Sequence, residues 1–131
     1  MSELDWSRWP DFKRHEFACK CGCDRAEMDP AFMDWLQGLR TALGKPMIPT
    51  SGYRCPDHNA AVSTSGRDGP HVRGVAVDIK AAGPYAHELL RLAMARGVRG
   101  VGSGQGRPWD KRFLHLDLMD PDRPTIWGYG S

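Results

Sequence analysis

The residues with the clearest chemical potential are His71, Asp78 and His115, in the segments H-V-R-G-V-A-V-D and F-L-H-L-D. Two imidazoles and one carboxylate are a donor set that suits zinc, and they leave a fourth tetrahedral position open for water. Six residues separate His71 from Asp78, so the pair lacks the i, i+4 spacing of a helical H-E-x-x-H site. The sequence therefore predicts a zinc site with an open position, built from a loop and from strands.

Two helices are expected among the elements that position these residues. One begins at Pro30, after the N-cap residue Asp29, because apolar residues then recur at helical spacing until Gly44. A second helix runs from Pro84 to Gly97, where glycine supplies a left-handed stop. Both helices have one apolar face, which predicts that they pack against a common core.

Shorter segments connect these helices to the site. Residues 46–54 contain two prolines and are expected to form a short edge strand. Residues 57–62 are expected to form a short helix, and the polar residues 63–70 an exposed loop that leads to His71. The glycine-rich residues 98–104 are expected to form a strand.

Two further segments alternate with the period of a strand. In residues 75–80 the apolar side chains fall on one face, so Asp78 points to the opposite face. In residues 113–118 three leucines share one face, while His115 and Asp117 share the other. Strand periodicity therefore separates the candidate ligands from the apolar rows.

The fold class that follows is α+β, with helices packed on one face of a mostly antiparallel sheet. A chain of 131 residues is expected to form a single domain, 1–131. We divide it into an N-terminal arm that contains cysteines (1–27), a catalytic core (28–118) and a C-terminal tail (119–131).

Composition excludes several classes of protein. Hydrophobic content of 40% and charged content of 26% are ordinary for a folded, soluble chain. The net charge of +2 is too small to indicate a nucleic-acid-binding protein. We interpret the local basic residues as solvated surface, with a mild attraction to an anionic polymer such as a cell wall as the alternative. No apolar run is long enough to span a bilayer, and the first ten residues lack the pattern of a signal peptide. We expect synthesis in the cytoplasm without an export signal.

Four ordered motifs resemble the D-alanyl-D-alanine carboxypeptidase family of zinc peptidases. They are H-x-x-G-x-A-x-D at His71 to Asp78, S-G-Y-R at Ser51 to Arg54, H-N at His58 and Asn59, and H-x-D at His115 to Asp117. The family includes bacterial cell-wall carboxypeptidases and endopeptidases, D-Ala-D-Ala dipeptidases and phage endolysins. It shares its fold with hedgehog signalling domains, so the resemblance implies a hedgehog-like fold.

The resemblance implies roles for individual residues. It makes His71, Asp78 and His115 the zinc ligands, and it implies that Arg54 binds the substrate carbonyl or carboxylate, a role that suits its fixed charge and planar fork. Ser51 and His58 are further candidates for substrate binding.

The general base is left open by the sequence. Family members often have Glu three residues before the last His ligand, but this chain has Arg112 there. Asp117 is the first alternative, either as the base or as a residue that orients His115. Asp110 is the second, and a base not yet identified is the third. A further departure is Gly69, where the family often has Ser.

The cysteines allow three interpretations. Cys19, Cys21 and Cys23 form C-K-C-G-C, and Cys55 follows later. They are reduced structural thiols, ligands of a second, structural zinc ion, or disulfides formed in an oxidising medium. C-x-C-x-C is tighter than the usual zinc-ribbon spacing, which disfavours the second metal site. Related wall peptidases carry similar segments, and we expect Cys55 to lie near this one and tie the arm to the core.

Together these observations predict a zinc-dependent metallopeptidase that hydrolyses an amide bond in peptidoglycan stem peptides, as a carboxypeptidase or an endopeptidase. A phage-type origin is expected, as a monomeric lysis enzyme released by a holin or as a virion component in contact with tail proteins. One alternative is a non-catalytic zinc-binding module of the same fold, which Arg112 favours. Another is a metal-dependent amidase that acts on a different small amide.

Overall fold

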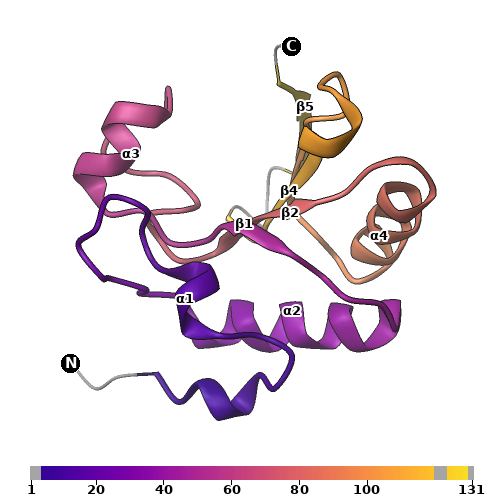
Figure 1. Cartoon of the computed structure of the whole chain (residues 1–131), viewed down its shortest axis with the longest axis horizontal. Helices are drawn as coiled ribbons and strands as arrows, with labels where there is room; N and C mark the ends of the chain where they lie inside the picture. Colours follow the sequence, from indigo (N-terminus) through magenta and orange to yellow (C-terminus); the bar gives the residue numbers. More distant parts are fainter. Residues whose placement is uncertain (1–3, 120–123, 130–131) are drawn as a thin grey trace.

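The computed structural model of the chain describes residues 4–119 and 124–129. Its longer helices are α2 (Pro30–Leu43) and α4 (Gly83–Ala95), and its shorter ones are η1 (Trp6–Arg8), α1 (Arg14–Phe17), α3 (Pro56–Val62) and η2 (Trp109–Lys111). Its strands are β1 (Pro49–Ser51), β2 (Ala76–Lys80), β3 (Gly100–Ser103), β4 (Phe113–Asp117) and β5 (Thr125–Gly128). Figure 1 shows this order along the chain.

The five strands form one sheet in the order β1-β2-β4-β3-β5. All pairings are antiparallel except that of β3 with β5. The predicted α+β class with a mostly antiparallel sheet is therefore confirmed. The predicted edge strand within 46–54 is β1, which is three residues long.

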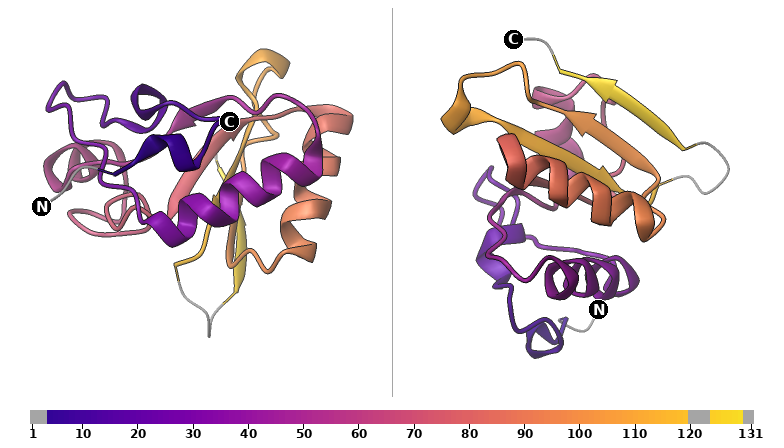
Figure 2. Two further views of the ribbon diagram at one scale, coloured as in Figure 1. Left: turned by 90° about the horizontal axis from the view of Figure 1, so that it is seen from below. Right: turned by 90° about the vertical axis from the view of Figure 1, so that its right-hand side faces the viewer.

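The expected long helix is α2, and local interactions define its ends. The carboxylate of Asp29 accepts a hydrogen bond from the backbone N–H of Ala31 at 3.0 Å, and Gly44 ends the helix in the left-handed region at φ 65°. Its apolar face is buried through five residues, Phe32, Met33, Leu36, Leu39 and Leu43. Figure 2 (right) shows α2 and α4 on the same side of the sheet.

The sheet has one apolar face and one polar face. Val77 and Ile79 of β2, with Leu114 and Leu116 of β4, are buried in the core beneath the helices. Side chains alternate along a strand, so the residues between them point to the other face. This is the face on which the candidate ligands lie.

Two parts of the fold were not predicted from the sequence. The N-terminal arm folds back as η1 and α1, and its aromatic residues pack together, with Phe12 and Phe17 in edge contact at 5.5 Å between ring centroids. Residues 125–128, assigned above to a C-terminal tail, form β5 at the edge of the sheet. The remainder of that predicted tail lies partly outside the described residues. No helix in the described part of the chain has the length and apolar character needed to cross a membrane.

Gly74 couples the loop that carries His71 to the start of α2. Its φ is +72°, its N–H donates to the carbonyl of His71 at 3.3 Å, and its carbonyl accepts from the N–H of Asp29 at 2.9 Å. A Cβ built on Gly74 would lie 2.8 Å from the backbone N of Asp29 and would also collide with the carbonyl of Glu27. Only glycine fits this position.

Gly74→Ala should therefore destabilise the fold by clearly more than Gly44→Ala. Both alanines would occupy the left-handed region, at a cost of about 1–2 kcal/mol, but a Cβ on Gly44 meets no atom within 4 Å. Urea unfolding of the two variants measures the difference. Equal losses in the two variants would show that the contact with the start of α2 is unimportant.

Candidate metal centre

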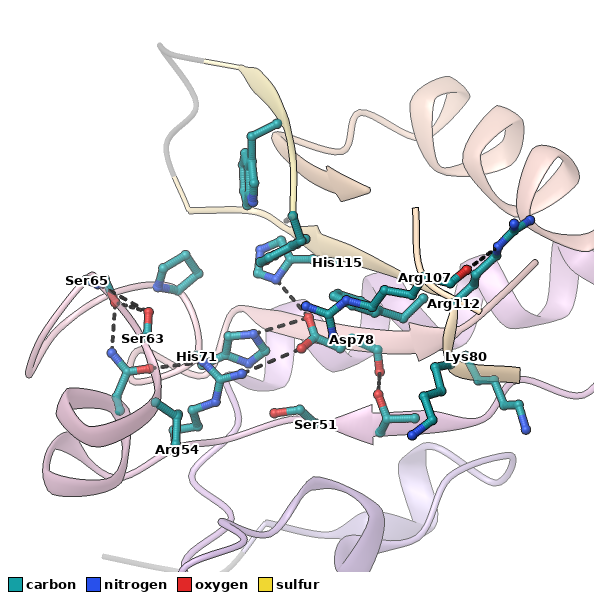
Figure 3. Close-up of a pocket in the computed structure, with 18 of the residues that line it drawn as sticks. Ser51, Arg54, Ser63, Ser65, His71, Asp78, Lys80, Arg107, Arg112 and His115 are labelled. Atoms are coloured by element: carbon teal, nitrogen blue, oxygen red, sulfur yellow. Dashed lines mark hydrogen bonds and ion pairs between the residues drawn. The ribbon is translucent and has the colours of Figure 1, made fainter. Parts of the chain in front are cut away.

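Three buried side chains converge on the polar face of the sheet. His71 comes from the loop before β2, Asp78 from β2 and His115 from β4, where Asp78 and His115 are direct cross-strand partners. The potential ligand atoms of the three residues all lie within 4.8 Å of one another. Figure 3 shows them at the floor of a cavity that they line together. The structure thus brings together the three residues that the sequence analysis selected as zinc ligands.

Hydrogen bonds fix the orientation of His71. Its Nδ1 lies 2.7 Å from the carbonyl oxygen of Gly52, so Nδ1 carries the proton and donates it. Its Nε2 lies 3.4 Å from Oδ1 of Asp78 and is free to bind a metal. A carbonyl that holds the second nitrogen of a histidine ligand is a recurrent feature of zinc sites.

The spacing of the donor atoms suits zinc. Bonds of about 2.0–2.2 Å to nitrogen and oxygen place tetrahedral ligand atoms about 3.3 Å apart. Oδ1 of Asp78 lies 3.4 Å from Nε2 of His71 and 2.9 Å from Nδ1 of His115. Two neutral imidazole nitrogens and one carboxylate therefore fit a zinc ion that keeps one position for water or substrate.

The charges of this cluster compensate one another. Burial alone would raise the pKa of Asp78, but the hydrogen bond from His115 and the nearby His71 ring outweigh it and lower the pKa below the ordinary value. Burial alone would lower the pKa of His115, but hydrogen bonds to Asp117 and Asp78 raise it to about 9. Without metal, the two carboxylates that face the ring nitrogens of His115 therefore favour its protonated form.

Asp117 lies behind His115 as seen from Asp78. Its Oδ2 is 2.7 Å from Nε2 of His115, and its Oδ1 accepts a hydrogen bond from the N–H of Met119 at 3.0 Å. It is buried and lines a different, smaller cavity from the one that the three ligands line. This position suits the orienting role better than that of a base.

Glycines on β3 make room for the site. Gly100 is paired with Asp117, and Gly102 with His115. A Cβ on Gly102 would lie 3.0 Å from Cβ of His115 and 2.8 Å from the indole nitrogen of Trp127, and one on Gly100 would collide with the Asp117 carboxylate. The glycine-rich character of this strand is thus explained by the side chains that it faces.

Arg54 lies beside the ligands and is held by Asn59. Its Nη2 is 3.6 Å from Oδ2 of Asp78, and its Nη1 donates to Oδ1 of Asn59 at 3.2 Å. The amide of Asn59 is buried and also donates to the carbonyl oxygens of Gly66 and Asp68, which ties down the loop before His71. Ser51 lines the same cavity.

Of the two residues of the H-N motif, the sequence analysis named His58 as the candidate for substrate binding, and that role stays a prediction. Asn59 lines the cavity, whereas His58 is not among the described residues that line it. A signal for Asn59 was available in the sequence. Asn59 lies in an expected short helix, and the loop that follows it contains glycines whose backbone carbonyls need hydrogen-bond donors.

The C-terminal strand contributes residues that sequence reasoning missed. The indole ring of Trp127 on β5 lies 5.1 Å from the imidazole of His115, and Tyr129 packs 5.0 Å from the ring of Phe113. Both Trp127 and Tyr129 line the cavity. An aromatic wall beside the ligands excludes water from one side of the site. No motif marked these residues, because only the pairing of β5 with β3 places them there.

The cavity also has a basic lining. Arg54 lies beside the ligands, and four more basic side chains line the cavity, namely Lys80, Arg107, Lys111 and Arg112. Arg112, which replaces the Glu often found in the family, donates from Nε to the carbonyl of Arg107 at 2.8 Å and stacks on Trp109 at 5.3 Å. Among the described residues that line this cavity, Asp110 is the one carboxylate besides Asp78.

Comparison with known proteins identifies the class. The model of the family described as Peptidase M15 matches residues 10–117. This range includes most of the arm, all three candidate ligands and Arg54, and the chain belongs to this family of zinc-dependent peptidases. A search of curated proteins finds no significant match.

Without metal, His115 should titrate with a midpoint near pH 9, well above its ordinary value of 6.5, because carboxylates face both ring nitrogens. The raised pKa stabilises the metal-free fold below about pH 6.5, and this stabilisation is lost as the pH rises through about 9. Side-chain NMR of the histidines, assigned with His115→Gln, measures the midpoint.

Zinc added at neutral pH should convert His115 to the neutral form, since only a deprotonated Nδ1 binds metal. A midpoint near 6.5 would contradict this arrangement.

Proposed function

We propose that this protein is a zinc metallopeptidase that hydrolyses an amide bond in the stem peptides of peptidoglycan. The observation that carries the proposal is the convergence of His71, Asp78 and His115 at the floor of a cavity whose rim is basic. Membership of the Peptidase M15 family supports the reaction class. The four motifs shared with cell-wall peptidases support the substrate.

Different residues of the protein have different roles in the proposed reaction. When bound, zinc would supply a nucleophile at neutral pH and polarise the scissile carbonyl. His71, Asp78 and His115 would hold the ion, and Asp117 keeps the His115 ring in place through Nε2. Arg54 presents a fixed positive charge beside them, positioned by Asn59 to bind the carbonyl oxygen or a carboxylate of the substrate.

The shape and charge of the cavity support a peptide that carries carboxylates. Its volume of about 900 Å³ accommodates a peptide segment and exceeds the needs of a small amide. Lys80 and Arg112 stand on the rim, away from the two histidines (Figure 3), and Lys111 also lines the cavity. Stem peptides carry free carboxylates, which these cations would attract. Cleavage at the end of such a peptide and cleavage within it are both consistent with this cavity.

We further propose that Asp110 is the general base. It lines the cavity from η2, two residues before the position where the family often has Glu. Asp117 is enclosed by its bonds to His115 and Met119, which directs both of its oxygens away from the substrate side. Asp117 is thus proposed as a positioning residue.

Purified protein should release peptide fragments from peptidoglycan, and a zinc chelator should abolish the release. Added zinc should restore it, because the ligands remain folded around the site. Mass spectrometry of the digested muropeptides identifies the bond that is cut. His71→Ala, which removes one ligand, serves as the inactive control.

The absence of any product from wild-type protein with zinc bound would overturn the peptidase proposal. It would favour the alternative of a non-catalytic zinc-binding module, for which Arg112 in place of Glu is the supporting observation. A phage-type lysis enzyme and a virion component both remain predictions from the sequence.

Asp110→Asn and Asp117→Asn should fail in different ways. Loss of a general base lowers turnover by about 10²–10⁴-fold, so Asp110→Asn should keep its zinc and lose kcat. Loss of a residue that orients a ligand weakens metal binding by about 10–100-fold, so Asp117→Asn should regain activity in excess zinc. Kinetics at two zinc concentrations separate these outcomes, with Asp57→Asn as a control outside the cavity. Full activity of Asp110→Asn would exclude it as the base.

A further inference from the structure

The four cysteines gather in one place, away from the cavity that the proposed reaction uses. The sulfur atoms of Cys19 and Cys21 are 3.4 Å apart, those of Cys19 and Cys55 are 3.7 Å apart, and those of Cys21 and Cys55 are 3.6 Å apart. All four sulfurs, including that of Cys23, lie within 4.8 Å of one another. The expected approach of Cys55 to the C-K-C-G-C segment is therefore present.

Two separate segments build this cluster. The turn that follows α1 is closed by a hydrogen bond from the N–H of Cys19 to the carbonyl of Arg25 at 2.7 Å, and Gly22 adopts a φ of +92° within it. Cys55 is the residue before α3, and its N–H donates to the sulfur of Cys19 at 3.4 Å. A backbone N–H directed at a sulfur stabilises a thiolate.

The distances fit a metal better than they fit disulfides. Zinc–sulfur bonds of about 2.3 Å place tetrahedral sulfurs about 3.8 Å apart, close to the three separations of 3.4–3.7 Å. A disulfide would bring two sulfurs to about 2.05 Å, whereas Cys21 is almost equidistant from Cys19 and Cys55. The spacing C-x-C-x-C is tight in sequence, but the turn and the distant Cys55 together complete a fourfold set.

We propose that Cys19, Cys21, Cys23 and Cys55 bind a structural zinc ion through four thiolates. Such a site is closed, with no position for water, so it serves the fold and carries out no chemistry. It joins the N-terminal arm to the start of α3. Arg54 directly precedes Cys55 and reaches Asp78, so the ion also fixes the backbone that carries Arg54 into the metal centre.

Counting the zinc ions bound per chain tests this proposal. The protein is purified under reducing conditions, zinc is added, and unbound zinc is removed by gel filtration before the analysis. Wild type should hold two zinc ions per chain, one for each candidate group. Cys21→Ser and Cys23→Ser should each lose one ion, and because both side chains are exposed their replacement leaves the core intact. Lys20→Ser, in the same exposed turn, is the matched control and should keep both ions.

The histidine site provides an independent reference. His71→Ala should lose one ion and keep the other, and its cobalt-substituted form should show thiolate-to-cobalt charge-transfer absorption. Cys21→Ser should lose part of that absorption while the histidine site keeps its metal. Failure of the peptidase proposal would therefore leave this result unchanged.

Two results would overturn the proposal. One is a wild-type chain with a single zinc ion that His71→Ala removes and Cys21→Ser does not. The other is an intact mass lower by two or four hydrogens, which would assign the cysteines to disulfides. If the serine variants fail to fold, alkylation of wild type decides the question: the proposal requires thiols that react slowly until a chelator is added, and immediate reaction of all four would contradict it.

Discussion

The antiparallel pairing of β2 with β4 is the constraint on which the rest of the site depends. Its register sets Asp78 directly opposite His115, on the polar face of a sheet whose other face is buried under α2 and α4. A shift of β2 by one residue would turn Asp78 into the core and the apolar row of β2 towards the cavity. The energy that maintains the ligand geometry therefore comes from the hydrophobic packing on the opposite face.

A buried carboxylate and two imidazoles are tolerated there because each charge has a partner. Asp78 accepts a hydrogen bond from His115 and lies 3.4 Å from Nε2 of His71, and His115 in turn reaches Asp117. Removing one of these side chains would leave an uncompensated charge in a region that water reaches poorly, and this would lower the stability of the fold. The same chain of contacts orients the ring of His115, so a feature needed for stability also prepares the site for metal.

Space on the polar face is as important as charge. Gly100 and Gly102 leave β3 without side chains where Asp117 and His115 project, and Trp127 then closes over the imidazole. In the same way, Gly74 lets the loop of His71 pass close to the start of α2. Small residues at these points set how closely the ligand-bearing segments can approach.

The sequence by itself determined the donor set, the strand faces and the main helices, because period-two and period-3.6 patterns depend on local geometry. It identified His71, Asp78 and His115 as candidate ligands. It also showed that Arg112 stands where family members often have Glu, so that position supplies no general base. Only the tertiary structure decided which polar groups meet. Strand β5 lacked a strong local signal because its place depends on pairing with β3, and the position of Asp117 behind the ring of His115, rather than in the cavity, follows from the twist and packing of the sheet.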